Sequence, residues 1–285
     1  MNVRTLPLVA AMVTLAVHLA GNPHYGFYRD ELYFIICGFH PAWGYVDQPP
    51  VVPLLAAGSQ VFGHSLFLLR LVPALFAAGG VYVTCLLVLE FGGGAYAQIV
   101  ASLAFLFAGV LMSFGTKVST DEVGLFTWPL IVLFVVRIVK GGDPRWWLAA
   151  GAALGVSLES KYSVAFFAVA LAGGLLLTPQ RRVLASPWFF AGMGLASLIE
   201  LPNFLWQAVH GFPMLELLHN GVASKWVIVG PGLYLLQQVL ITGFFLAPVW
   251  ILGLVWLVLD RSMRFLAFTY TILIALMIVL HGHHY

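Results

Sequence analysis

The sequence predicts an all-α fold, a bundle of helices that crosses a membrane several times. Hydrophobic residues make up 61% of the 285 residues and charged residues only 8%, whereas about a quarter of a soluble domain is charged. Apolar runs of membrane-crossing length recur along the whole chain. Without a basic stripe or an aromatic platform on a polar surface, no nucleic-acid partner is expected. The chain therefore reads as a polytopic membrane protein.

About nine apolar segments are candidate spans. They cover residues 5–22, 65–89, 97–115, 122–140, 146–158, 163–177, 187–203, 233–259 and 265–280. Turn-forming glycine, proline and aspartate residues separate several of them, as at Gly92–Gly94 and Gly141–Pro144. The first segment could instead be a secretory signal peptide. Because no clean small-x-small cleavage site precedes Asn22, a retained helix is favoured.

The basic residues predict how the chain is oriented in the membrane. With Arg4 on the cytoplasmic side, eight of the thirteen basic residues share that side, the others being Arg137, Lys140, Arg145, Arg181, Arg182, Arg261 and Arg264. The outer side then receives eight of the eleven carboxylates: Asp30, Glu31, Asp47, Asp121, Glu122, Glu159, Glu200 and Glu216. The expected location is the plasma (inner) membrane, with the N-terminus cytoplasmic and the reactive groups outside.

Two outer loops are long, at about residues 22–64 and 204–232. Their short apolar stretches, Leu32–Phe39 and Pro213–Leu218, suit helices that lie in the membrane interface. No internal repeat, low-complexity tract or soluble domain interrupts the chain, so residues 1–285 are expected to form a single membrane domain. Cys37 and Cys85, in an outer loop and an apolar span, predict no disulfide framework.

Asp30 and Glu31 open a predicted interfacial helix in the first outer loop. Acidic residues are favoured at this position because they face the exposed N–H groups of the first turn, so a simple helix cap is one interpretation. The other is catalytic, since carboxylates beside the bilayer core are costly and usually functional. Adjacent residues point about 100° apart on a helix. At most one of the two can therefore face a given site as a general base.

Asp47 and Asp121 belong to different outer loops and are candidate metal ligands. Asp47 precedes Gln48-Pro49-Pro50, whose two prolines restrict the backbone and fix the position of the carboxylate. Asp121 lies where the fourth span starts, and the alternative interpretations are a turn residue for Asp47 and an N-cap for Asp121. Both could share a divalent cation held by oxygen ligands. A divalent metal is thus a possible cofactor.

Three basic residues on the outer side run against the general charge bias and are candidate phosphate ligands: Arg29, Lys117 and Lys161. Lys161 could equally pair with Glu159 or extend to the membrane surface. The C-terminal histidines His281, His283 and His284 form a weaker candidate metal cluster.

At these residues the chain resembles the membrane glycosyltransferases of the protein O-mannosyltransferase and lipid A aminoarabinose transferase type, which are glycosyltransferase family 39-like members of the GT-C superfamily. The resemblance rests on Tyr28-Arg29-Asp30-Glu31-Leu32-Tyr33, Trp43-Gly44-Tyr45-Val46-Asp47-Gln48-Pro49-Pro50, Ser119–Glu122, Ser160-Lys161-Tyr162, Pro202-Asn203-Phe204-Leu205-Trp206-Gln207 and His210–Glu216. The first two segments together are fairly specific.

The resemblance implies a transferase that uses a polyprenyl-phosphate-linked sugar on the outer face of the membrane. It implies that Asp30, with Glu31 beside it, supplies the catalytic base, and that Asp47 and Asp121 lie where a metal or polar site is found. Aminoarabinose transferases carry a lysine and an arginine where this chain has Gln48 and Tyr33. Gln48 is placed with the substrate-binding residues, and phosphate binding is assigned to Lys161, Lys117 or Arg29. Relatives are usually longer, so the chain is expected to be a GT-C-type catalytic domain truncated at its C-terminus.

The predicted reaction transfers a sugar from a polyprenyl-phosphate donor to the hydroxyl of a lipid, glycan or protein acceptor, with membrane lipid as the surrounding partner. A transporter or flippase of a lipid-linked sugar is a rival, which predicts charges and broken helices near the middle of the membrane. The charges of this chain gather at one surface instead, which disfavours transport. A non-catalytic membrane fragment is the third alternative.

Overall fold

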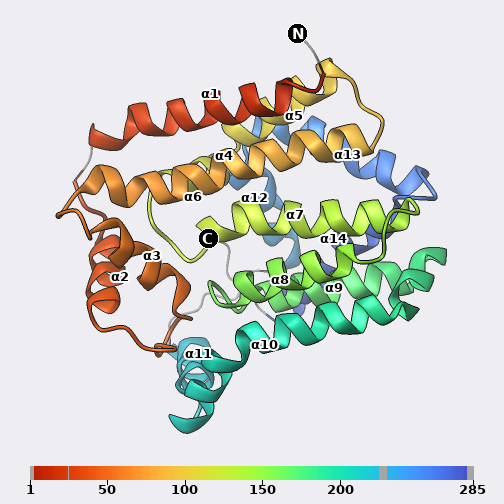
Figure 1. Ribbon diagram of the computed structural model, residues 1–285. Helices are drawn as coiled ribbons and strands as arrows, with labels where there is room; N and C mark the ends of the chain where they lie inside the picture. The colour runs from red at the N-terminus through yellow and green to blue at the C-terminus, as the bar shows by residue number, and fades with distance from the viewer. Residues whose placement is uncertain (1–2, 25, 225–229, 281–285) are drawn as a thin grey trace.

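A computed structural model describes residues 3–24, 26–224 and 230–280. Figure 1 shows a bundle of helices that run roughly along one direction, with further helices packed at one end. The long helices of the first half are α1 (Leu6–Gly21), α4 (Leu66–Glu90), α5 (Ala95–Phe107), α6 (Gly109–Thr116) and α7 (Glu122–Val139). The second half contains α8 (Trp146–Leu158), α9 (Val164–Leu176), α10 (Pro187–Val209), α12 (Pro231–Thr242), α13 (Ala247–Leu259) and α14 (Arg264–Val279).

The predicted apolar segments all form helices, but not all of these helices are long enough to span a membrane. In the described residues, α4, α7 and α10 are long and apolar enough to cross, and up to six spans result if each of three bent helix pairs counts as one. α1, α8 and α14 are shorter apolar helices. A helix of 13 residues such as α8 is about 20 Å long, less than the roughly 30 Å of the bilayer core. Three to six of the nine expected spans therefore meet this test.

Two of the predicted spans are not straight. The segment at 97–115 is divided into α5 and α6, which meet at 67°, and the segment at 233–259 bends by 94° between α12 and the helices after it. Gly243 adopts a positive φ of 108° at the second bend, a conformation that glycine adopts without strain. The two breaks lie close together, because a Cβ on Gly109 would lie 3.3 Å from the carbonyl oxygen of Ile241.

Small residues bring α8 and α10 into close contact. A Cβ on Gly151 would lie 2.0 Å from the carbonyl oxygen of Gly192, and Gly155 faces Ala196 one turn further along. Such glycine pairs let membrane helices approach closely. The core beside this contact is apolar, with Trp147 and Phe265 almost fully buried. This packing holds the first half of α10 against α8, and the sequence motif at residues 202–207 follows on the same helix.

The two long outer loops contain the helices that the sequence predicts. The first loop forms α2 (Arg29–Phe39) and α3 (Val51–Ser59), preceded by the 3-10 turn Asn22–His24, and the second forms α11 (Pro213–Ser224). Figure 1 shows α2, α3 and α11 at one end of the bundle, beside the C-terminal end of α10. The remaining short 3-10 helices are Pro179–Ala185 and Phe244–Leu246.

The opposite end of the bundle carries the α4–α5, α7–α8 and α9–α10 connections (Figure 1). Arg137 Nε lies 2.9 Å from Glu90 Oε1, and Lys140 Nζ lies 3.4 Å from Glu90 Oε2. These ion pairs join the ends of α4 and α7. The acidic motifs and most of the basic residues therefore lie at opposite ends of the bundle.

Candidate functional site

Glu31 is a fully enclosed carboxylate of the acidic end. Its side chain is 0% exposed, and Arg70 of α4 binds both of its oxygens, Nε to Oε1 and Nη2 to Oε2 at 2.9 Å each. Glu31 Oε2 also accepts a hydrogen bond from the backbone N–H of Tyr28 at 2.8 Å, which caps α2. The helix-cap interpretation is thus correct for Glu31. With its oxygens occupied and no exposure, this carboxylate stabilises the site rather than facing a substrate.

Asp30 has the opposite environment. Its side chain is 44% exposed, and among the described residues it pairs with the neighbouring Arg29, whose Nε lies 3.2 Å from Oδ1. The Arg29 side chain is 90% exposed, so this contact is weak. Asp30 is therefore accessible at the first turn of α2.

The segment between α6 and α7 lies against the start of α2. The backbone N–H of Val118 points to Glu31 Oε1 at 3.4 Å. The ammonium group of Lys117 lies 4.4 Å above the ring centroid of Tyr28, a cation–π distance. Lys117 is thus held beside the N-terminus of the helix that carries Asp30.

Asp47 lies beside α2 as well. The hydroxyl group of Tyr33 donates a 2.7 Å hydrogen bond to Asp47 Oδ1. Burial, and then the hydrogen bond to Asp47, raise the pKa of Tyr33, so the hydroxyl group keeps its proton. The loop before Pro49 is held separately, because the Tyr45 hydroxyl group donates to the carbonyl oxygen of Cys37 at 2.8 Å.

Asp121 and Lys161 form a half-buried ion pair. Lys161 Nζ lies 2.7 Å from both carboxylate oxygens of Asp121, and the side chains are 30% and 26% exposed. Ser160 strengthens the same contact by donating to the carbonyl oxygen of Thr120 at 3.0 Å. The pair joins the start of α7 to the α8–α9 connection. Lys161 thus pairs with Asp121 rather than with Glu159.

The carboxylates do not fit the expected divalent metal. Both oxygens of Asp121 face an ammonium group, and one oxygen of Asp47 accepts from Tyr33. Among the described residues, no group of three or more His, Cys, Asp or Glu side chains could hold a metal ion. The C-terminal histidines His281, His283 and His284 lie outside the described residues. A metal requirement stays a prediction for which these side chains provide no site.

Hydrogen bonds from α10 connect the remaining motifs. Asn203 Nδ2 donates to the carbonyl oxygen of Trp43 at 2.9 Å, and Gln207 Nε2 donates to that of Tyr45 at 3.1 Å. The Tyr162 hydroxyl group donates to Asn203 Oδ1 at 2.7 Å. Burial is the main reason why the pKa of Tyr162 rises to about 12, so it remains a donor at neutral pH.

These contacts form a closed ring of motifs. It runs from α2 through the loop 43–50 to α10, then through Tyr162 to Lys161, and through Asp121 and Val118 back to α2. These contacts join residues up to 162 positions apart in the sequence, as between Tyr45 and Gln207. The ring brings Asp30, Asp47, Lys117 and Lys161 to one end of the bundle.

Two other polar side chains of this end are enclosed. Gln48 is 2% exposed, and neither of its amide atoms has a hydrogen-bond partner among the described residues. As placed, it is not accessible to a substrate. Glu159 is 6% exposed, and burial, with repulsion from Glu200, raises the pKa of its carboxyl group to about 8. Its backbone carbonyl accepts from Val51 N–H at 3.0 Å, which attaches α3 to the end of α8.

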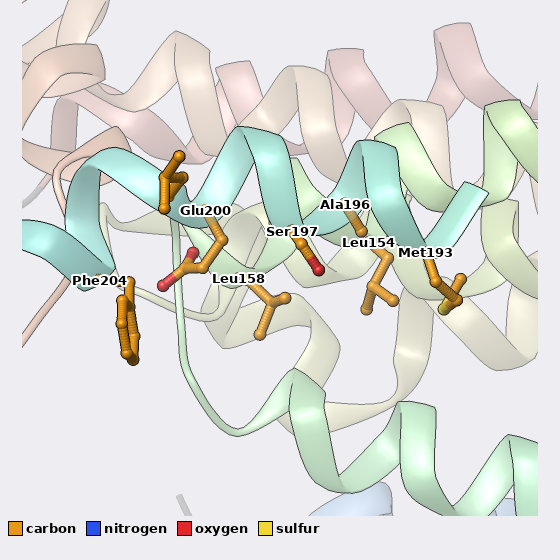
Figure 2. Close-up of a pocket in the computed structure, with 8 residues that line it drawn as sticks. Leu154, Leu158, Met193, Ala196, Ser197, Glu200 and Phe204 are labelled. Carbon is orange, nitrogen blue, oxygen red and sulfur yellow. The ribbon is translucent and has the colours of Figure 1, made fainter. Parts of the chain in front are cut away.

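A largely apolar cavity of about 320 Å³ lies on the flank of the bundle between α8 and α10. Figure 2 shows the side chains of Ser197 and Glu200 pointing away from α10 to the same side, among Leu154, Leu158 and Met193. Glu200 lies one turn before Asn203 on α10. The cavity thus ends beside the ring of motifs.

Sequence reasoning missed several residues that hold the site together. Arg70 drew no attention, although an arginine in the first turns of an apolar span is a signal in itself. In the sequence, Tyr33 is a departure from the family pattern, and its position one turn after Asp30 gives no hint of Asp47. Asn203 and Gln207 belong to one of the family motifs, but the motif itself does not indicate that they bind the loop 43–50.

Comparison with known proteins gives one family match and one relative. The family model described as dolichyl-phosphate-mannose-protein mannosyltransferase matches residues 47–206, more than half of the 285 residues. The chain is 23% identical over 209 residues to lipid A galacturonosyltransferase RgtD of Rhizobium johnstonii, and this match covers 73% of the chain and 43% of the relative. The chain therefore matches less than half of that relative's length, and no solved structure matches it. With its helical spans and this match, the chain belongs to the dolichyl-phosphate-mannose-protein mannosyltransferase family of multi-pass membrane proteins.

Proposed function

We propose that the protein is a membrane glycosyltransferase that moves a sugar from a polyprenyl-phosphate-linked donor to an acceptor hydroxyl group at the outer face of the membrane. The observation that carries the proposal is the ring of motifs, which gathers an exposed carboxylate and several cations at one end of a membrane bundle. The family match supports the donor class. The name of the relative makes lipid A a reasonable acceptor to test, beside glycans and proteins.

In the proposed reaction, Asp30 accepts the proton of the acceptor hydroxyl group as its oxygen attacks the anomeric carbon of the donor sugar. The bond between that carbon and the phosphate oxygen breaks, and negative charge develops on the polyprenyl phosphate. Cations near the leaving group stabilise this charge. Arg29 lies next to Asp30, and Lys117 lies over the ring of Tyr28, two positions before Asp30. Lys161 is available if the phosphate replaces Asp121 as its partner.

The outer location of the site rests on the charge distribution. The basic end of the bundle carries Arg137, Lys140 and Arg145, and the positive-inside rule assigns this end to the cytoplasm. The ring of motifs then lies outside. Labelling of a cysteine introduced at the exposed Phe62, on an otherwise cysteine-free background, by a membrane-impermeant reagent in intact cells tests this assignment.

Transport of a lipid-linked sugar is a second candidate, because the breaks between α5 and α6 and beside Gly243 lie close together. Discontinuous helices of this kind line the substrate sites of transporters. However, no ionisable side chain lies at residues 107–109 or 242–244. The acidic motifs and their basic partners lie in the ring of motifs instead, which favours the transferase.

One experiment separates these functions. The purified protein is placed in liposomes that contain a radiolabelled polyprenyl-phosphate sugar in one leaflet and a hydroxyl-bearing lipid acceptor. The transferase predicts label on the acceptor, without movement of the donor between leaflets. Movement of the intact donor without transfer would identify a transporter. If no donor is either transferred or moved, both functions are contradicted.

A further inference from the structure

The carboxylates of the ring differ in how their charges are balanced. Glu31 pairs with Arg70, Asp121 with Lys161 and Asp30 with Arg29. Asp47 instead accepts a hydrogen bond from the neutral Tyr33 hydroxyl group. Among the described residues no Lys, Arg or His forms an ion pair with it. Its negative charge is therefore not offset by a neighbouring cation.

Through its hydrogen bond to Asp47, Tyr33 also places the negative charge of Asp47 near Asp30, the candidate base. Asp30 and Tyr33 are three positions apart in α2, so both side chains lie on one side of the helix. Both residues are accessible, and Tyr33 is 40% exposed. The Tyr33 hydroxyl group uses Oδ1 of Asp47 and leaves Oδ2 for another donor. A hydroxyl group of a bound sugar is a suitable donor for such an oxygen.

The orientation of the Asp47 side chain depends on the Tyr33 hydroxyl group, whereas the position of the loop 43–50 does not. Tyr45 holds the loop through its hydroxyl group, bonded to the Cys37 carbonyl oxygen at 2.8 Å, and through its N–H, bonded to the Gln48 carbonyl oxygen at 3.0 Å. Asn203 and Gln207 hold it from the other side. Loss of the Tyr33 hydroxyl group should thus free the Asp47 side chain without displacing the loop.

We propose that Tyr33 is a positioning residue that orients Asp47 toward the sugar of the donor, and that the unbalanced charge of Asp47 selects a sugar without a carboxylate over a uronic acid. This inference rests on the proposed transferase function and deepens it by naming the class of sugar. It differs from what the name of the relative, a galacturonosyltransferase, would suggest. The physical reason is that two carboxylates within a few ångströms repel each other.

The test compares three lipids with the same polyprenyl phosphate, one carrying a hexose, one the corresponding uronic acid and one no sugar. Their dissociation constants are measured by competition with a fluorescent polyprenyl phosphate, using the protein in nanodiscs of neutral lipid. We expect the hexose lipid to bind about ten-fold more tightly than the uronate lipid at low ionic strength. This preference should shrink at high salt because the charges are screened.

Substitutions assign the preference to the two residues. Asp47→Asn should abolish it, and Tyr33→Arg should reverse it, because the arginine would balance Asp47 and attract the uronate. Tyr33→Phe should weaken binding of the hexose lipid about three-fold and leave binding of the bare phosphate lipid unchanged. Tyr96→Phe, an 80% exposed tyrosine at the basic end, is the matched control. Monodisperse protein with unchanged thermal stability shows that each variant is folded.

Two results would overturn the inference while leaving the proposed function intact. One is a wild-type protein that binds the uronate lipid as tightly as the hexose lipid or more tightly. The other is a preference that Asp47→Asn and Tyr33→Arg both leave unchanged. If none of the three lipids binds, the proposed function falls and the inference falls with it.

Discussion

Arg70 and Glu31 form a two-point ion pair that is almost fully enclosed, with both nitrogen–oxygen distances at 2.9 Å. Arg70 also donates to the carbonyl oxygens of Asn22 and Gly26, at 3.0 and 2.7 Å. One guanidinium group therefore holds the end of α1, the following loop and the start of α2 together. The pair fixes the helix that presents Asp30.

The first prediction concerns this ion pair. Removing one partner of a buried pair leaves the other charge unpaired and costs about 3–5 kcal/mol. Glu31→Gln should therefore lower the thermal unfolding temperature strongly, and Arg70→Met likewise. Because each single change strands one charge, the double variant should lose less stability than the sum of the two. Thermal unfolding in detergent checks this, and strictly additive losses would show that the residues are not coupled.

The second prediction concerns Asp121 and Lys161. Their pair is half-buried, so it should contribute only about 1 kcal/mol to stability. If Lys161 binds the donor phosphate, Lys161→Gln should raise the KM for the donor about ten-fold, whereas Asp121→Asn frees the lysine and should raise it far less. Steady-state kinetics with both variants check this. Equal increases in KM would indicate that the pair acts only as a structural link.

The third prediction uses the close contact between the loop 43–50 and α10. A Cβ on Gly44 would lie 2.6 Å from the Trp206 ring and 2.8 Å from Asn203 Nδ2. Gly44→Ala should therefore push the loop away from α10 and break the bond between Asn203 and the Trp43 carbonyl group. Gly194→Ala, on the same helix but with nothing within 4 Å of its Cβ, is the matched control. The affinity of both variants for the donor is measured, and Gly44→Ala should bind it more weakly than Gly194→Ala. Equal affinities would contradict the ring of contacts.

The fourth prediction concerns pH. Burial and repulsion from Glu200 raise the pKa of the Glu159 carboxyl group to about 8. The folded state then holds this proton up to about pH 8, whereas the unfolded chain releases it near pH 4.5. The folded state binds more protons in this window, so stability falls as the pH rises from about 4.5 to 8.

Glu159→Gln removes this titration. At pH 8.5 the variant should unfold about 3 °C higher than the wild type, corresponding to about 1 kcal/mol. At pH 4.5 the two proteins should unfold at similar temperatures. Thermal scans across this range check the prediction, and a constant difference at every pH would show that Glu159 is not the titrating group.

Much of the fold could be predicted because hydropathy reports burial in a membrane directly. The apolar segments, the helix at Leu32–Phe39 and the gathering of the acidic residues at one end all follow from local sequence. The bends at Ala108 and Gly243 could not be predicted in this way, since they lie where α6 and α12 contact each other. A continuous apolar run gives no sign of them.

The candidate site could be predicted only as a set of segments. Asp30 and Glu31 are adjacent in the sequence, and both carry a carboxylate. Only the structure shows that Asp30 is exposed and that Glu31 is enclosed and paired with Arg70. Likewise Asp121 was paired with Asp47 as a metal ligand, but its oxygens face Lys161, forty positions further along. Such partners come from distant helices, and no local pattern reports them.

The most direct test of the proposed transferase is the rate of sugar transfer by wild type, Asp30→Asn and Asp30→Glu, with labelled polyprenyl-phosphate hexose as donor. The exposed Asp30 contributes little to folding, so all three proteins should unfold at the same temperature. Asp30→Asn should slow transfer about 10²- to 10⁴-fold, the usual contribution of a general base, and Asp30→Glu should restore part of the rate. An Asp30→Asn protein that transfers sugar at the wild-type rate would contradict the assignment of Asp30 and of this end of the bundle as the active site.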